Sequence, residues 1–413
     1  ITIMDKIKIL VIPSDRMGVG KFRSVDPHVY IAEHYADEFD IDICYIDQIP
    51  TENTKNFFAQ YDLVHIHKQL DNDMLLMNML KELSIPVVLD IDDYFHLSDF
   101  HPMVITARKE KWHEKIINHI RKADYVTTTT DIYAKTLRKY NQNVSVFPNA
   151  INPDEKQYSY QKNESDKIRF GIVCGSSHLH DIQRLKGIAE CARPDNNVQL
   201  VLCGFDTNGT RTIYDEKTGQ VYRRKILPQE SMWFEYERII TDDYKYCSQE
   251  HKNFLMKFVP GVDDPFVNEP YRRMWTRSIN SYATHYQNID VLLAPLKDTE
   301  FNKMKSELKE IECGFTKTAL IAENLGPYTI NLTSMIGFGG TINDKGTALL
   351  VDPRKDHKDW VKYINKLATN PEMIEKLKDN IHSLVVDKYS MDKVCKDRVN
   401  FYKEIMKNKK RDV

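Results

Sequence analysis

The chain of 413 residues lacks an excess of charge, a closely spaced cysteine pair and a long hydrophobic run. Its 58 Lys and Arg nearly balance its 60 Asp and Glu, which argues against sequence-independent nucleic-acid binding through a basic surface. No apolar run approaches the roughly 18 residues of a membrane span. The run KIKILVIP near the start is too short for the core of a secretory signal, so we expect a cytoplasmic location.

The seven cysteines are scattered, and no two of them form a C-x-x-C pair. Several stand in apolar runs such as GIVCG and LVLCG, which indicates buried, reduced thiols rather than disulfides or zinc ligands. We therefore expect no metal site. A hydrophobic content of 41% supports folded domains, and the length of the chain favours two of them.

Strand and helix signals alternate through residues 1–150, which predicts an N-terminal domain built on a parallel sheet. Six short apolar runs read as strands, from KIKILVIP to VSVFP. The helices of this domain are expected near residues 26–37, 71–83, 105–121 and 131–140. The polar residues 151–167 read as a linker between domains.

The alternation restarts in residues 168–390, which predicts a second domain of the same kind. Residues 205–286 interrupt it, and their runs MWFEYERII, EHKNFLMKFV and YRRMWTRSINSYATHY are expected to form a helical insertion. Other helices are expected at 179–192, 303–313, 356–369 and 371–386. A closing helix at 391–408 lies in the final segment, 391–413. Ligands of such sheets bind beyond the carboxyl ends of the strands.

One expected helix carries charged residues at a spacing that suits a nucleotide diphosphate. In FNKMKSELKEIECGF, residues 301–315, Lys305, Lys309 and Glu312 fall at i, i+4 and i+7, so on one helix they lie within about 40° of each other. Cations near a helix N-terminus favour a diphosphate, and a carboxylate one turn further can accept hydrogen bonds from a ribose. A solvated helix face has the same spacing, and the spacing alone does not decide.

The Gly-rich loop SDRMGVGKFR follows the first expected strand. Gly18 and Gly20 permit a positive φ and a close approach of the backbone to a ligand. Lys21 and Arg23 of the same loop could reach an anion. A tight turn that binds nothing has the same composition.

The block LDIDDYFHL places Asp92 and Asp93 after the fourth expected strand. These carboxylates fit a polar wall of an active site. Helix capping and a divalent metal are the alternatives.

The turn FGIVCGSSHLHD begins the second domain with small residues after a strand. Gly175, Ser176 and Ser177 stand where backbone amides point outward toward an anion, and His178 follows. Capping of the next helix by Ser177 is the alternative that needs no ligand.

Together and in this order, these blocks resemble the retaining GT-B glycosyltransferases with a "glycosyl transferases group 1" C-terminal domain. The Gly-rich loop, ADYVTTTTDIYAKTL, VSVFPNAI, GIVCGSSHLHD and FNKMKSELKEIECGFTKTALIAENLGPY all have counterparts there. The chain is most similar to a branch with a DxDD block and an N-x-x-K-S-x-x-K-x-x-E block, found in bacterial surface-polysaccharide pathways and large phages. The resemblance implies an α/β fold with two Rossmann-like doubly wound domains facing a cleft.

The resemblance also implies roles for single residues. Glu312 matches the second glutamate of the family's E-x7-E motif, which binds the nucleotide ribose, whereas Met304 replaces the first. Lys305 and Lys309 match basic positions of the branch and are expected on the donor diphosphate. The other donor-binding positions are expected at Gly18, Gly20, Gly175, Ser176, Ser177 and His178.

The catalytic group departs from the family pattern. Asp92 and Asp93 stand where many relatives carry a histidine after the fourth strand, so these two carboxylates are the expected catalytic residues. The closing helix matches a segment that crosses back to the N-terminal domain.

The expected function is transfer of a sugar from a nucleoside-diphosphate sugar, with retention and with no metal or other cofactor. The acceptor is a glycan, a lipid-linked glycan, a protein or modified phage DNA. The basic end, KNKKRDV, offers a peripheral contact to an anionic membrane, or is a solvated helix end. A nucleotide-sugar epimerase and a nucleotide-binding module without turnover are the competing classes.

Overall fold

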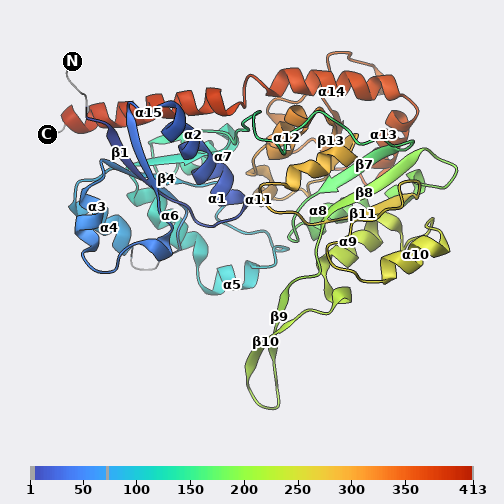
Figure 1. Cartoon of the computed structure of the whole chain (residues 1–413), viewed down its shortest axis with the longest axis horizontal. Helices are drawn as coiled ribbons and strands as arrows, with labels where there is room; N and C mark the ends of the chain where they lie inside the picture. The colour runs from blue at the N-terminus through green and yellow to red at the C-terminus, as the bar shows by residue number, and fades with distance from the viewer. Residues whose placement is uncertain (1–4, 71–73, 412–413) are drawn as a thin grey trace. The chain divides into compact units, whose positions relative to one another are not determined.

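The chain forms two compact units in a computed structural model that describes residues 5–70 and 74–411. The first unit contains residues 1–155, 299–311 and 385–413, and the second contains residues 156–298 and 312–384. Each unit holds one six-stranded sheet (Figure 1). The predicted fold class, two Rossmann-like α/β domains, is confirmed.

The sheet of the first unit is parallel throughout, with strand order β2-β1-β3-β4-β5-β6. Its strands are β1 (Ile7–Ile12), β2 (Phe39–Ile43), β3 (Leu63–His67), β4 (Val87–Asp90), β5 (Tyr125–Thr128) and β6 (Val144–Val146). Every residue of β3 and β4 is buried, as expected for central strands that helices cover on both faces. All six strands were predicted from the apolar runs.

The helices of the first unit lie between these strands, close to the predicted ranges. They are α1 (Gly18–Gly20), α2 (Asp26–His34), α3 (Thr54–Ala59), α4 (Leu75–Glu82), α5 (Val104–Lys109), α6 (Trp112–Lys122), α7 (Asp131–Leu137), α11 (Glu300–Lys303) and α15 (Met391–Arg411). The helix predicted over 105–121 is two helices, because Lys111 adopts a left-handed φ of 54° and interrupts the run. Part of the helix predicted over 71–83 lies outside the described residues.

Helix α15 belongs to the first unit although it ends the chain. Val394, Val399 and Tyr402 of this helix pack in one core cluster with Ile9 and Val11 of β1. Figure 1 draws α15 beside α2 and above β1. The side chains of 410–413, at the basic end, lie outside the described part, so the expected membrane contact stays a prediction.

The sheet of the second unit has strand order β11-β8-β7-β12-β13-β14 and is also parallel. In chain order within the unit this is 3-2-1-4-5-6, the doubly wound order of dinucleotide-binding domains. The strands are β7 (Ile168–Val173), β8 (Val198–Phe205), β11 (Tyr271–Trp275), β12 (Val291–Ala294), β13 (Ala319–Glu323) and β14 (Leu349–Val351). The helices are α8 (Leu179–Ile182), α9 (Met232–Thr241), α10 (Gln249–Met256), α12 (Leu308–Thr316), α13 (Lys358–Ala368) and α14 (Pro371–Val385).

Residues 205–286 are less helical than predicted. They form α9 and α10, but also an exposed hairpin of β9 (Thr210–Tyr214) and β10 (Val221–Lys225), which projects from the second unit in Figure 1. The run YRRMW, predicted as helix, is the edge strand β11. Its residues Tyr271 and Trp275 are buried in the core of the unit, as are Trp233 and Tyr236.

Two predicted helices of the second half are interrupted. The helix predicted over 179–192 is α8 followed by short 3₁₀ turns, with Gly187 at a φ of 105°. The helix predicted over 303–313 is split into α11 and α12, and residues 304–307 between them are not helical. The boundary between the two units falls inside α12, between residues 311 and 312.

Among the described residues, no helix is both long and apolar enough to span a bilayer. The seven cysteines are free thiols, and five of them are buried, as predicted from their apolar surroundings.

Candidate functional site

A polar cluster lies at the carboxyl ends of β3 and β4, beside the point where the first sheet reverses its strand order. His67 ends β3 and is fully buried. Its Nε2 lies 3.0 Å from an Asp92 carboxylate oxygen and 3.7 Å from Asp90. Lys68 approaches the same Asp92 oxygen at 4.0 Å. Parallel sheets bind ligands at this edge, so the cluster is a candidate ligand site.

The two predicted catalytic carboxylates have pKa values that are displaced in opposite directions. Burial alone would raise the pKa of Asp92, but the charge and hydrogen bond of His67, together with Lys68, hold it well below the ordinary value. Burial, and next the charge of Asp92, raise the pKa of Asp93, which Lys68 and Lys305 oppose only in part. Asp92 therefore stays ionised and can accept a hydrogen bond, whereas Asp93 holds its proton more tightly.

A chain of buried hydrogen bonds supports this cluster from behind. The Arg23 guanidinium donates to both oxygens of Asp90 at 2.7 and 2.9 Å and to the side-chain Oδ1 of Asn149 at 3.2 Å. The side-chain Nδ2 of Asn149 donates to the Ser306 hydroxyl at 3.1 Å. Arg23 was expected to reach a bound anion. Its side chain is instead 1% exposed and forms an ion pair with Asp90. These hydrogen bonds connect the segment before α12 to Asp90 of the polar cluster.

Lys305 lies in that segment, and its charge opposes part of the rise in the pKa of Asp93. It precedes α12, whereas Lys309 lies in the first turn of α12, so the two lysines do not share the continuous helix that was predicted. Both are half-buried. They still flank the N-terminus of one helix, which is where a phosphate binds most favourably.

Glu307 stands at the start of α12, and sequence reasoning did not single it out. It is 2% exposed, and its Oε1 has no hydrogen-bond partner. Burial raises the pKa of Glu307 to about 8. At neutral pH it is largely protonated and adds little negative charge beside the two lysines.

The Gly-rich loop differs from the expectation. Gly20 has a φ of −57° and lies in a helical turn, so positive φ is not the reason for a glycine there. A Cβ at Gly20 would lie 1.9 Å from the Asp15 carbonyl oxygen. The Asp15 carboxylate accepts from the amides of Met17 at 2.8 Å and Gly20 at 3.0 Å, and it fills the start of the helix that contains Gly18. Donor binding by Gly18 and Gly20 stays a prediction.

The turn after β7 lies where the second sheet reverses its strand order, between β7 and β12. Gly175, Ser176 and Ser177 are exposed. Ser177 does not cap α8, because the residue at the cap position is His178, whose side chain makes no capping bond. The turn therefore presents small exposed residues at the usual ligand edge.

Tyr236 of α9, in the insertion 205–286, makes two hydrogen bonds to the backbone of this turn. Its hydroxyl donates to the Gly175 carbonyl oxygen at 3.1 Å and accepts from the His178 amide at 2.7 Å. The His178 Nδ1 lies 2.9 Å from an Asp181 oxygen, and the other Asp181 oxygen accepts from the amide of Lys297. The loops that follow β7 and β12 are thereby tied together.

Glu312 is fully buried in the second unit. One carboxylate oxygen accepts from the Tyr286 hydroxyl at 2.5 Å, and the other accepts from the Tyr282 hydroxyl. Each carboxylate oxygen has a second acceptor position, so these bonds do not decide whether a ribose can bind. The ribose role stays a prediction.

Within the first unit, the structure brings Asp92, Asp93 and Lys305 together, and Lys309 follows at the start of α12. Within the second unit, it brings together the residues from Gly175 to His178. Sequence reasoning missed His67 and Lys68, although His67 ends the apolar run YDLVHIH and Lys68 directly follows it. A polar residue at a strand end is the same signal that identified Asp92. The contact of Tyr236 with the turn after β7 was not predicted, because a tyrosine in a helix carries no such signal.

Solved structures share this fold over nearly the whole chain. HepE from Anabaena, in complex with UDP and glucose, matches with a TM-score of 0.63 and 10% identity over 96% of this chain and all of that one. Sucrose-phosphate synthase from Thermosynechococcus elongatus matches with a TM-score of 0.60 and 14% identity, over 98% of this chain and all of that one. An alpha-glucosyltransferase in complex with UDP-glucose and DNA matches with a TM-score of 0.55 and 13% identity, over 96% of this chain and 98% of that one. No family model and no curated protein matches the sequence.

Proposed function

We propose that the chain is a glycosyltransferase that moves a sugar from a nucleoside-diphosphate sugar to an acceptor hydroxyl. The observation that supports this best is the start of α12, where Lys305 and Lys309 flank a helix N-terminus and the charge of Lys305 acts on Asp93. The fold agrees with it, because HepE and the alpha-glucosyltransferase were solved with UDP or UDP-glucose on the same architecture. UDP-sugars are therefore the first donors to test.

The charges at the start of α12 suit the leaving group of this reaction. As the anomeric C–O bond breaks, negative charge collects on the diphosphate, and preorganised cations and amides stabilise that charge. Lys305, directly before α12, and Lys309, in its first turn, place two cations where they would stabilise this charge.

Asp92 is the group that can interact with the acceptor. It is ionised and held by His67, so it can accept a hydrogen bond from the attacking hydroxyl. We propose retention of the anomeric configuration and a chemical step without metal, because cations and amides can take the place of a metal at the diphosphate.

The first experiment identifies the donor and separates the competing classes. A thermal-shift panel of nucleotides and nucleotide sugars finds the donor, because a ligand of the folded state raises the melting temperature by mass action. Product assays with that donor and with glycan, lipid-linked, protein and DNA acceptors follow. Conversion of the donor without any acceptor would establish an epimerase, and binding without turnover would establish a binding module.

Lys309→Ala tests the diphosphate assignment. We expect kcat/KM to fall by about 10²–10³, the usual loss when one stabilising donor to a developing charge is removed, with the melting temperature nearly unchanged. Lys303→Ala is the matched control, since Lys303 in α11 is half-exposed and pairs with Glu300 on the surface. An unchanged kcat/KM in Lys309→Ala contradicts the assignment.

Chelation tests the metal-free chemical step. Transfer is expected to continue at the same rate in excess EDTA and to gain nothing from added Mg²⁺ or Mn²⁺. Loss of activity that Mg²⁺ or Mn²⁺ restores would instead assign Asp92 and Asp93 to a divalent cation.

A further inference from the structure

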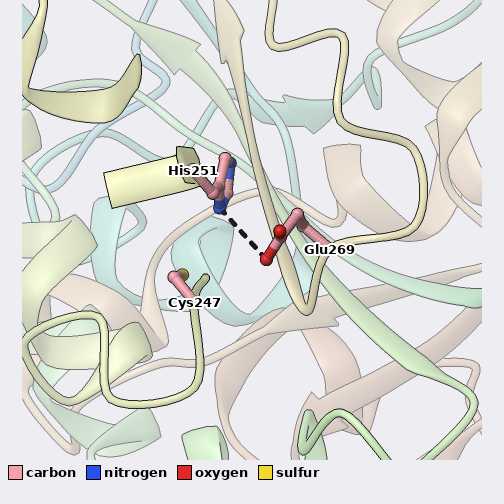
Figure 2. Close-up of side chains that lie close together, drawn as sticks. All are labelled: Cys247, His251 and Glu269. Carbon is pink, nitrogen blue, oxygen red and sulfur yellow. Dashed lines mark ion pairs between the residues drawn. The ribbon is translucent and has the colours of Figure 1, made fainter. Parts of the chain in front are cut away.

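Three side chains that can bind a metal converge in the segment between β8 and β11, and the proposed transfer reaction uses none of them. Cys247 precedes α10, His251 lies in its first turn and Glu269 precedes β11. One ligand atom from each lies within 4.8 Å of the other two. Figure 2 shows the three side chains close together, Cys247 and His251 from the start of α10 and Glu269 from the segment before β11.

The histidine of this cluster has one ring nitrogen without a hydrogen-bond partner. His251 is fully buried, and its Nδ1 makes no hydrogen bond. This nitrogen lies 3.7 Å from an oxygen of Glu269, which is too long for a hydrogen bond. A buried imidazole nitrogen without a partner costs stability, and a metal ion between these atoms would remove that cost.

The other ring nitrogen is held as metal-binding histidines usually are. The His251 Nε2 lies 2.6 Å from a carboxylate oxygen of Asp264, which is fully buried, and the other Asp264 oxygen accepts from the Phe266 amide at 2.8 Å. An Nε2–H donated to Asp264 leaves a lone pair on Nδ1, which lies 3.7 Å from Glu269. A carboxylate behind the ligating histidine is the common arrangement of zinc sites.

The donor set and its spacing fit zinc. A thiolate, an imidazole and a carboxylate are its ordinary protein ligands. Around a tetrahedral ion with bonds of about 2.0–2.3 Å, the ligand atoms lie about 3.3–3.8 Å apart. The present separations, which reach no more than 4.8 Å, need a contraction of up to about 1.5 Å. The amide of Ser248 donates to Glu269 at 3.2 Å and its hydroxyl donates to the other oxygen, which orients that carboxylate.

We propose that Cys247, His251 and Glu269 bind one Zn²⁺ ion, with Asp264 as the positioning residue and a water as the fourth ligand. Binding forms a bond from zinc to the Cys247 sulfur and releases the thiol proton to solvent. This proposal departs from the expectation of no metal site, which rested on cysteine spacing. Cysteine spacing carries no signal for such a site, because the site uses a single cysteine and its third ligand is 18 residues beyond His251 in the sequence.

The proposed ion would join three segments of the second unit. The Cys247 amide donates to the Tyr244 carbonyl oxygen at 3.1 Å, and the Tyr244 hydroxyl donates to Glu237 of α9 at 2.5 Å. Glu269 leads into β11. The ion therefore acts as a structural link among the loop after α9, α10 and the edge of the sheet, separate from the transfer chemistry.

Titration of the metal-stripped full-length protein with Zn²⁺ alone tests the site. We expect one equivalent to bind, the melting temperature to rise and about one proton to be released per ion. Co²⁺ in place of Zn²⁺ is expected to give a thiolate-to-cobalt charge-transfer band. If the wild type takes up no Zn²⁺, the proposal is overturned.

Variants assign the ligands. Cys247→Ser should abolish the cobalt band and weaken Zn²⁺ binding at least tenfold, whereas Cys44→Ser, which removes a half-buried thiol of the first unit, should change neither. Asp264→Asn should weaken Zn²⁺ binding about 10–100-fold. Should Cys247→Ser fail to fold, Glu269→Gln is measured in its place. The site is refuted if the variant that folds, Cys247→Ser or Glu269→Gln, binds Zn²⁺ as tightly as the wild type and gives the same cobalt band.

Discussion

Gly20 and Gly175, two of the predicted donor-binding residues, differ in how much space surrounds them. A Cβ at Gly20 would meet the Asp15 backbone at 1.9 Å, whereas a Cβ at Gly175 would meet no atom within 4 Å. Packing of the folded chain therefore requires the first glycine and not the second. A glycine that packing does not require, in an exposed turn at the ligand edge of a sheet, is best explained by a ligand that approaches the backbone closely.

Gly175→Ala separates binding from folding at this turn. We expect the free energy of unfolding to change by less than about 0.5 kcal/mol, and the KM for the donor to rise about tenfold, equivalent to about 1.4 kcal/mol. The comparison variant, Gly20→Ala, should lower the melting temperature by several degrees through its clash. The ligand explanation for Gly175 fails if donor KM in Gly175→Ala equals that of the wild type.

At the scale of elements, the segment 301–315 shows what sequence periodicity could and could not predict. The charges occur at helical spacing, which predicted one helix over 303–313. The structure breaks it at 304–307, where Met304 packs in the core of the first unit and Ser306 accepts from Asn149. These contacts come from residues more than 150 positions away, and no local pattern records them. The proximity of the lysines to a helix start was predicted correctly, but its geometry was not.

Glu307, at the start of α12, should make stability depend on pH. Burial raises its pKa to about 8 from 4.5. Between those values the folded state binds more protons than the unfolded state, so the free energy of unfolding falls as pH rises from 4.5 to 8. At roughly 1.4 kcal/mol per pKa unit, the loss amounts to a few kcal/mol.

Urea denaturation of wild type and Glu307→Gln from pH 4.5 to 8.5 measures this effect. Glutamine imitates the protonated carboxyl, so the variant should lack this decline and gain stability relative to wild type as pH rises. Glu300→Gln, which changes an exposed carboxylate of α11, should follow the wild type. Parallel curves for wild type and Glu307→Gln would show that Glu307 ionises normally in the folded protein.

The sheets themselves were readable from the sequence, because central parallel strands are continuous apolar runs bounded by polar turns. The runs from KIKILVIP to VSVFP became β1–β6 without exception. The edge strand β11 was missed because YRRMW is charged as well as aromatic. Only the folded unit shows that Arg273 in this strand pairs with Glu237 of α9, an ion pair that allows charges in a buried strand.

At the scale of the whole molecule, the chain passes between its two units at four places, after residues 155, 298, 311 and 384. The first unit is therefore assembled from three segments, and neither unit is a single continuous stretch. Helix α15 shows what this means for stability, because it places six buried residues in the core of the first unit. They are Met391, Val394, Cys395, Val399, Tyr402 and Ile405.

These six side chains decide whether the first 155 residues can fold alone. At about 1.5–3 kcal/mol for each fully buried apolar side chain, as an upper estimate, α15 contributes on the order of 10 kcal/mol. A domain typically has only about 5–15 kcal/mol of net stability. Residues 1–155 alone should therefore lack a cooperative urea transition, and co-expression with residues 385–413 should restore one. A cooperative transition in the isolated 1–155 fragment would show instead that β1–β6 and their helices fold without the end of the chain.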